Sequence, residues 1–198
     1  MTLPAFRVEA TRGPLTESVH PVSAAVVDAS GRLLASAGNP ELVTWWRSAA
    51  KPFQALPLLL DGVADRFGFD GPELALASAS HSSEPLHLEA IARFMEKAGV
   101  RESELACGPH MPLSPAVAEA VIRDGVVPTP RWSNCSGKHT GMLALARHHG
   151  WPREGYNAVG HPVQDRILDE VCRWTGAHRD AIRTAPDGCT AACFALPL

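Results

Sequence analysis

The sequence predicts an α+β protein in which a small N-terminal sheet is followed by a longer, mainly helical part. Residues 19–27 alternate and then run apolar, residues 28–31 have turn composition, and residues 32–36 resume a strand, which is the pattern of a β-hairpin. After residue 48, apolar side chains recur at helical spacing between proline and glycine boundaries. Because no internal repeat or low-complexity linker interrupts the chain, we expect one domain over residues 1–198.

The helices are expected in the following order. The first begins at the Ser48 segment, where Pro52 falls near the first turn and Pro57 is expected to kink or end the helix early. The clearest helical pattern covers residues 85–98, with Ser83 as the expected N-cap and Gly99 as the stop. The other expected helices are residues 72–78 capped by Asp70, a helix opened by Ser114 and Pro115 that ends at Gly125, residues 137–149, and residues 162–174.

The end of the sequence is expected to be a turn that leads into a strand. Residues 184–189 have turn composition, and the last residues, 195–198, are apolar without a polar cap. We therefore expect a C-terminally incomplete fold, with further strands of the sheet supplied from beyond residue 198.

Composition and charge exclude several classes of protein. The formal net charge is −3 with acids and bases interspersed, so we expect neither a nucleic-acid nor a membrane partner. The hydrophobic content of 45% is typical of a soluble globular protein, and no apolar run is long enough to span a bilayer. The first residues lack the apolar region of a secretory signal, and five cysteines at irregular spacing do not form a disulfide framework. Both observations favour a cytoplasmic, reducing location.

Ser48 and Lys51 form a Ser-x-x-Lys motif where a loop turns into a helix. The chain has fifteen arginines but only three lysines, namely Lys51, Lys97 and Lys138. A desolvated lysine can release its proton whereas arginine cannot, so a neutral Lys51 could take the hydroxyl proton of Ser48 and make it a nucleophile. The motif alone is short enough to arise by chance.

A second polar cluster, residues 78–84, surrounds a histidine with hydroxyl groups. Ser80 and His81 could provide a second nucleophile and hydrogen bonds to a polar substrate. The alternative for Ser83 and Glu84 is that they only cap the helix that follows.

Residues 133–141 place polar groups at a glycine-punctuated helix start. Backbone N–H groups there favour an anion or a developing oxyanion. The segment lacks the upstream glycine of a phosphate-binding P-loop, so we reject that motif. Cys135 and His139 are four residues apart and could share a metal ion on one helix face, although most such cysteines are simply buried. Asp187-Gly188-Cys189 could present a carboxylate and a thiol together, or could be a plain loop.

Taken together, these segments resemble one family. VEATRG with ESVH, WWRSAAKPFQALPLL, ASASHSSEPLH, SNCSGKHTGM and DGC occur in this order over nearly the whole chain. They resemble the rhizobial-type (class 3) L-asparaginases of the asparaginase II family. The family's fold is similar to the α/β sandwich of serine β-lactamases, penicillin-binding proteins and serine-type glutaminases, and its members hydrolyse L-asparagine to L-aspartate and ammonia.

The resemblance also implies roles for individual residues. Ser48 and Lys51 would form one nucleophile–base pair, and Ser80 would be the serine of a second pair whose lysine lies beyond residue 198. Cys135, Lys138 and Cys189 would bind zinc with support from Asp187. Substrate contacts are expected from Arg47, His81, Asn134, Ser136, His139 and Asp187. The chain departs from the family in its shorter length and in the residues that follow Cys189, where the family usually continues with Gly-Ala-Pro.

We therefore expect an amidohydrolase that acts on L-asparagine through a Ser–Lys nucleophile, holds zinc and forms a homodimer. Two other interpretations stay open. One is a Ser–Lys hydrolase of another amide, such as glutamine or a lactam. The other is a truncated, inactive chain that retains the zinc or ligand pocket.

Overall fold

The computed structural model describes residues 6–197, which form two compact units. The first contains the described residues up to Trp45 together with those from Ala195 onward, and the second contains Trp46–Phe194. Helices fill the second unit and short strands make up the first, so the predicted α+β class is confirmed. The prediction of a single domain over residues 1–198 stays a prediction.

The first unit is built from antiparallel strand pairs. Strand β1 (Phe6–Arg12) pairs with β2 (Leu15–Val22), and β3 (Ala24–Val27) pairs with β4 (Leu33–Ala37). The predicted hairpin is the β3–β4 pair, but residues 19–22 belong to β2 rather than to one long strand. Asp28 closes the β3–β4 turn, because its Oδ1 accepts the backbone N–H groups of Ser30 at 2.9 Å and of Arg32 at 3.1 Å.

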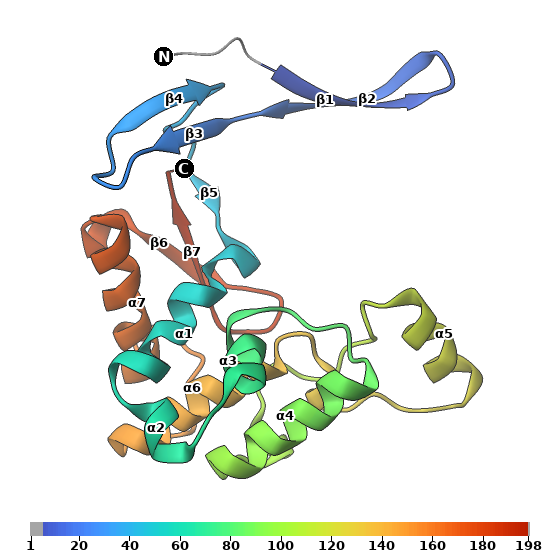
Figure 1. Cartoon of the computed structure of the whole chain (residues 1–198), viewed down its shortest axis with the longest axis vertical. Helices are drawn as coiled ribbons and strands as arrows, with labels where there is room; N and C mark the ends of the chain where they lie inside the picture. The colour runs from blue at the N-terminus through green and yellow to red at the C-terminus, as the bar shows by residue number, and fades with distance from the viewer. Residues whose placement is uncertain (1–5, 198) are drawn as a thin grey trace. The chain divides into compact units, whose positions relative to one another are not determined.

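The second unit consists of seven helices and two C-terminal strands (Figure 1). The helices are α1 (Lys51–Leu60), α2 (Val63–Phe67), α3 (Gly71–Ser78), α4 (Pro85–Ala98), α5 (Pro115–Arg123), α6 (Ser136–His149) and α7 (Pro162–Thr175). Short 3₁₀ turns cover Arg47–Ala50, Glu102–Glu104, Pro130–Trp132 and Arg179–Ala181. Strand β6 (Arg183–Pro186) neighbours β7 (Ala192–Leu196), whose last two residues belong to the first unit and pair with β5 (Thr44–Trp45).

Most predicted helix boundaries are confirmed to within two residues. Pro57 is the exception, because α1 continues through it to Leu60. A proline inside a helix removes one backbone hydrogen bond, but here Pro57 and Leu58 are buried and pack the inner face of α1. None of the helices in the described part of the chain has the length and apolar character needed to span a membrane.

The predicted N-cap of α4 is also corrected. The N-cap is Glu84, whose backbone N–H is accepted by Nδ1 of His87 at 3.2 Å. Ser83 has a left-handed backbone (φ 58°), and its hydroxyl donates to the carbonyl of Trp132 at 2.7 Å. Ser83 therefore ties the start of α4 to the segment before α6 instead of capping the helix.

Helix α6 is the core of the second unit. It packs against α3, α4 and α1, and its residues from Ser136 to Ala146 are all buried. Gly137 permits this, because a Cβ there would collide with the carbonyl oxygen of Leu76 in α3. A helix start that buries Ser136, Lys138 and His139 is unusual, because such groups enter a core only when they find partners.

Candidate active site

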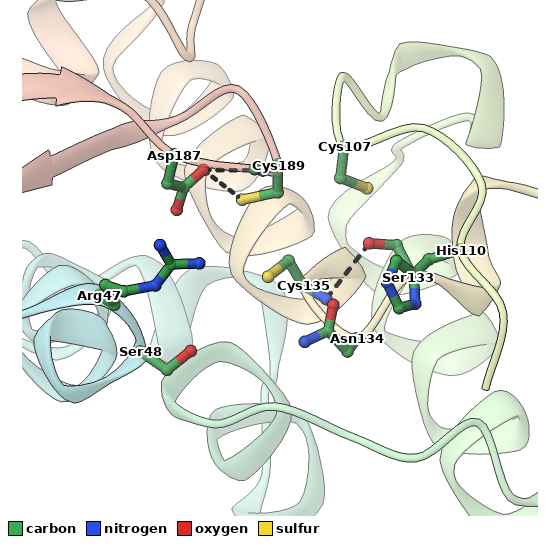
Figure 2. A pocket seen from close by; sticks show the side chains of 10 residues that line it. Arg47, Ser48, Cys107, His110, Ser133, Asn134, Cys135, Asp187 and Cys189 are labelled. Carbon is green, nitrogen blue, oxygen red and sulfur yellow. Dashed lines mark hydrogen bonds between the residues drawn. The ribbon is translucent and has the colours of Figure 1, made fainter. Parts of the chain in front are cut away.

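A polar cavity of about 200 Å³ lies in the second unit, where several loops meet the start of α6. Figure 2 shows the side chains of Arg47 and Ser48 on one side of it, Asp187 and Cys189 on another, and Cys135 between them. Six lining residues were predicted as site residues: Arg47, Ser48, Asn134, Cys135, Asp187 and Cys189. Segments more than a hundred residues apart in the sequence thus converge on one space.

Arg47 and Ser48 are presented by the 3₁₀ turn that precedes α1. Trp46 anchors this turn through its N–H, which donates to the carbonyl of Phe194 at 2.9 Å. Arg47 has a left-handed backbone (φ 47°), a conformation that non-glycine residues rarely adopt and that clusters at functional sites. The result is that both side chains point into the cavity and stay exposed to solvent.

Lys51 is almost completely buried, with 2% of its surface exposed, and it contacts Ser80. Its Nζ donates to Ser80 Oγ at 2.8 Å, to the carbonyl of Ala79 at 3.2 Å and to the carbonyl of Asn134 at 3.4 Å. Ser80 Oγ lies 3.5 Å from Ser48 Oγ. Ser48 and Lys51 are thus connected through Ser80, whereas the sequence suggested a direct pair.

Lys138 lies behind the opposite wall of the cavity in a strongly charged environment. Its Nζ is 2.9 Å from Cys189 Sγ and 3.1 Å from Asp187 Oδ2. Burial alone would lower the pKa of Lys138, but the neighbouring Cys189 and Asp187 groups raise it above its ordinary value. Burial would likewise raise the pKa of Asp187, but the charge of Lys138 and hydrogen bonds from Cys189 hold it low. The two groups form a buried ion pair.

The two predicted cysteine ligands face the same wall. Contact with Cys189 lowers the pKa of the Cys135 thiol to about 6 against the opposing effect of burial. The same contact, together with burial, raises the pKa of Cys189 to about 12. Of the two thiols, Cys135 is therefore the one that releases its proton more readily.

His139 is fully buried behind Cys189 and does not line the cavity. Its Nδ1 lies 2.6 Å from the hydroxyl of Tyr156 and its Nε2 lies 3.3 Å from Cys189 Sγ. Burial lowers the pKa of His139, which favours the neutral imidazole. Its predicted substrate contact stays a prediction, and the structure gives it protein partners instead.

His81 and Ser136 are buried together beside the start of α6. His81 Nε2 donates to Ser136 Oγ at 2.8 Å, because its Nδ1 already accepts the N–H of Ser83 at 3.2 Å. Burial, together with the nearby His87 and Lys51, lowers the pKa of His81 to about 4. Neither residue lines the cavity, so their predicted substrate contacts also stay predictions.

Four cavity residues were not predicted from the sequence: Cys107, His110, Ser133 and Gly188. Cys107 and His110 lie in an irregular segment that follows the 3₁₀ turn Glu102–Glu104, where no spacing pattern identifies them. Burial raises the pKa of Cys107 to about 11, so its thiol keeps its proton. Ser133 Oγ accepts the N–H of Cys135 at 3.4 Å and so shapes the turn into α6 (Figure 2).

The donors predicted for zinc meet at this wall: two cysteines, which are usual zinc ligands, and a lysine, which is not. Among residues 6–197, no group of three or more histidine, cysteine, aspartate or glutamate side chains is arranged to hold a metal ion. Two thiols and the Lys138 amine do converge, and sulfur and neutral nitrogen are donors that zinc prefers. The set fits zinc if Lys138 gives up its proton, since metal binding releases protons from its ligands.

The chain is thus an α+β protein with one polar cavity. Near this cavity lie an exposed serine, a buried lysine, two thiols and a lysine–aspartate ion pair. The family model for L-asparaginase II matches residues 8–198. The chain therefore belongs to the L-asparaginase II family, which supports an amidohydrolase-like enzyme. A comparison with curated proteins gave no match.

Proposed function

We propose that this protein hydrolyses L-asparagine to L-aspartate and ammonia with Ser48 as the nucleophile. The family suggests the reaction, and one observation supports the residue: the exposed Ser48 hydroxyl at the cavity wall is linked through Ser80 to the buried amine of Lys51. A serine hydroxyl needs a base that removes its proton before it can attack an amide carbon.

The proposed proton path runs through Ser80. Ser48 Oγ passes its proton to Ser80 Oγ as Ser80 passes its own to a neutral Lys51 Nζ. Ser48 then attacks the side-chain amide carbon of asparagine, and the proton held by Lys51 returns along the same path to the departing ammonia. Water subsequently attacks the ester that links aspartate to Ser48, Lys51 accepts the proton of the water through Ser80 and returns it to Ser48 Oγ, and aspartate is released.

Substrate binding is assigned to the residues at the cavity wall. The exposed guanidinium of Arg47 suits the α-carboxylate of asparagine, because arginine pairs bidentately with carboxylates. Asn134 and Asp187 also line the cavity and offer an amide and a carboxylate to the polar groups of the substrate. The developing oxyanion is placed near the start of α6, where the helix dipole favours negative charge.

Zinc is proposed to bind Cys135, Lys138 and Cys189, with Asp187 in support. When bound, the ion would supply a fixed positive charge at the wall opposite Ser48. Without it, Lys138 carries that charge itself as part of the Asp187 ion pair.

Three further properties belong to the proposal: the type of α/β sandwich, the cellular location and the oligomeric state. A strand region followed by a serine-bearing turn and helix is compatible with the serine β-lactamase-like α/β sandwich. A cytoplasmic homodimer is the assembly we propose, and size-exclusion chromatography with light scattering tests the dimer directly.

Replacing Ser48 with alanine tests the nucleophile. We expect Ser48→Ala to reduce ammonia release from asparagine by on the order of 10³-fold or more, because loss of a covalent nucleophile removes the main route to the acyl-enzyme. Ser78→Ala is the matched control, since the Ser78 hydroxyl donates to the carbonyl of Leu74 in its own helix. Full turnover in Ser48→Ala would exclude the assignment.

A panel of amides tests the substrate. Asparagine, glutamine and a β-lactam are offered to the wild-type protein and to Ser48→Ala, and the release of ammonia or opening of the lactam is measured. If wild-type protein turns over glutamine or the lactam faster than asparagine, that compound is the preferred substrate instead. Ser48 remains the nucleophile if the turnover is lost in Ser48→Ala.

A further inference from the structure

Tyr156 is the only tyrosine of the chain, and nothing in the sequence motifs draws attention to it. It lies between α6 and α7, with 2% of its surface exposed, and it does not line the cavity. Its hydroxyl lies 2.9 Å from the backbone nitrogen of Ala106 and 2.6 Å from Nδ1 of His139. The buried Tyr156 hydroxyl thus connects His139, which contacts Cys189, with Ala106, which precedes Cys107.

One arrangement of protons gives the Tyr156 hydroxyl proton an acceptor in these contacts. The N–H of Ala106 can only donate, so the Tyr156 oxygen accepts there and its own proton is free for His139 Nδ1. A neutral imidazole that accepts at Nδ1 carries its proton on Nε2. His139 Nε2–H therefore points its proton toward Cys189 Sγ, 3.3 Å away.

Further hydrogen bonds near Tyr156 connect the segment that carries Cys107 with the segment that carries Cys189. Thr190, directly after Cys189, donates its hydroxyl to the carbonyl of Ala106 at 3.1 Å. The Asn157 side-chain amide in turn donates to the hydroxyl oxygen and the carbonyl of Thr190, at 3.0 and 3.2 Å. Ala106 is thus held at both its N–H and its C=O, and the next residue is Cys107 at the cavity wall.

We propose that Tyr156 is a positioning residue of this active site: it fixes His139 in the Nε2–H form that donates to Cys189, and with Asn157 and Thr190 it sets the separation of the Cys107 and Cys189 walls. The kinetic part of this inference rests on the proposed asparaginase activity, whereas the structural part does not. Its physical basis is that groups behind a functional side chain control its orientation and its tautomer.

A merely structural role for Tyr156 makes a different prediction. A purely structural hydroxyl would lower stability when removed, and activity would fall only as the protein unfolds. A positioning hydroxyl would change the proton distribution of His139 and lower kcat in protein that remains folded. The two roles are therefore separable by measurement.

The test is Tyr156→Phe, which keeps the ring and removes the hydroxyl. The His139 tautomer is measured by two-bond ¹H–¹⁵N correlation NMR of the histidine-labelled full chain, with His139→Gln used to assign the signal. We expect the wild-type signal of a single Nε2–H form and its loss or shift in Tyr156→Phe. We also expect kcat to fall about tenfold to a hundredfold, as for other groups that orient a site residue, while KM stays within about twofold.

The matched control is Thr175→Val. The Thr175 hydroxyl accepts one backbone N–H, from Ala177 at 3.2 Å, and donates to the carbonyl of Val171 at 2.7 Å, but it touches no cavity residue. We expect it to lower the melting temperature without changing kcat or the His139 signal. Equal losses of kcat in Thr175→Val and Tyr156→Phe would overturn the proposal.

A double-mutant cycle with His139→Gln tests whether Tyr156 acts through His139. The glutamine of His139→Gln has an amide that can still donate toward Cys189 but does not depend on the tyrosine for its tautomer. We expect the effect of Tyr156→Phe on kcat to disappear in the His139→Gln background, and an undiminished effect would overturn the link through His139. If wild-type protein shows no turnover of asparagine, the proposed function fails, while the NMR result still decides the positioning role.

Discussion

The chain buries two lysines beside one cavity, and in the part that the structure describes only one of them has a carboxylate partner. Lys51 donates to the oxygens of Ser80, Ala79 and Asn134 and also interacts with the Cys135 thiol, but within residues 6–197 it pairs with no carboxylate. Lys138 contacts the carboxylate of Asp187 and the thiol of Cys189. Lys138 thus has a carboxylate partner, whereas Lys51 has none among these residues.

The two environments suit the lysines to different tasks. A carboxylate partner favours the charged form of an amine and keeps its proton in place. The hydrogen bond from Lys51 to Ser80 suits its proposed role in proton exchange, and the ion pair of Lys138 suits its proposed role as a fixed charge or metal ligand. Lys97, the third lysine, pairs with Glu73 at 2.7 Å and lies outside the cavity lining.

Lys51→Arg is the most direct test of this contrast between the lysines. Arginine retains the positive charge but cannot act as a base, so we expect turnover of asparagine to fall by about 10³-fold. Steady-state ammonia release measures the loss, and circular dichroism checks that the fold is retained.

The control for this change is Lys97→Arg. The same substitution there keeps an ion pair with Glu73 and leaves the cavity untouched, so we expect turnover to be unchanged. Lys51→Arg with wild-type turnover would contradict the role of Lys51 as the base.

Gly137→Ala tests the helix contact on which both lysines depend. A Cβ at this position collides with the carbonyl of Leu76, so α6 must move away from α3, and we expect a loss of about 3 kcal/mol in the free energy of unfolding. The shift also separates Asn134, just before α6, from Ser80, two residues beyond the end of α3. Urea denaturation and ammonia release measure the two effects.

Gly71→Ala is the matched control for the glycine. No atom lies within 4 Å of the position that a Cβ would take at Gly71, and its φ is not in the left-handed region, so we expect stability to change by less than about 0.5 kcal/mol. Similar losses at both glycines would contradict the close approach of α3 and α6.

Lys138→Met tests the ion pair between Lys138 and Asp187. It leaves Asp187 without its counter-charge, and we expect a loss of about 2 kcal/mol, less than for a fully buried pair because the Asp187 side chain is 18% exposed. Zinc content per chain, measured by elemental mass spectrometry, should also fall, since Lys138 is a proposed ligand.

Lys138→Arg separates charge from metal binding. Arginine preserves the ion pair but offers no lone pair, so we expect stability to recover in large part while zinc binding stays lost. Zinc retained at wild-type level in both variants would remove Lys138 from the proposed ligand set.

The sequence predicts most helices of the second unit because their boundaries carry strong local signals. Helix α4 begins at Pro85 and ends before Gly99, as the composition indicates. The β1–β2 hairpin was missed because its residues are largely exposed and show no clean apolar alternation. The choice between Ser83 and Glu84 as N-cap depends on the contact of Ser83 with Trp132, 49 residues away.

The site shows the same division between local and distant information. Ser48, Cys135, Asp187 and Cys189 stand in dense polar motifs, and the structure brings all four to one cavity. The link from Lys51 to Ser80 joins residues 29 positions apart, and spacing alone could only pair Lys51 with its neighbour Ser48. His139 is polar and adjacent to Lys138, yet it faces Tyr156, which no local pattern predicts.

The left-handed backbone of Arg47 has a consequence for how this chain responds to selection. The same conformation occurs at Ser83 and at Thr190, which has a φ of 70°. Each costs a non-glycine residue roughly 1 kcal/mol that glycine does not incur. At Ser83 and Thr190 the hydrogen bonds of the hydroxyls to Trp132 and Ala106 offset this cost, so a screen for heat resistance would favour glycine chiefly at Arg47 and remove a side chain that lines the cavity.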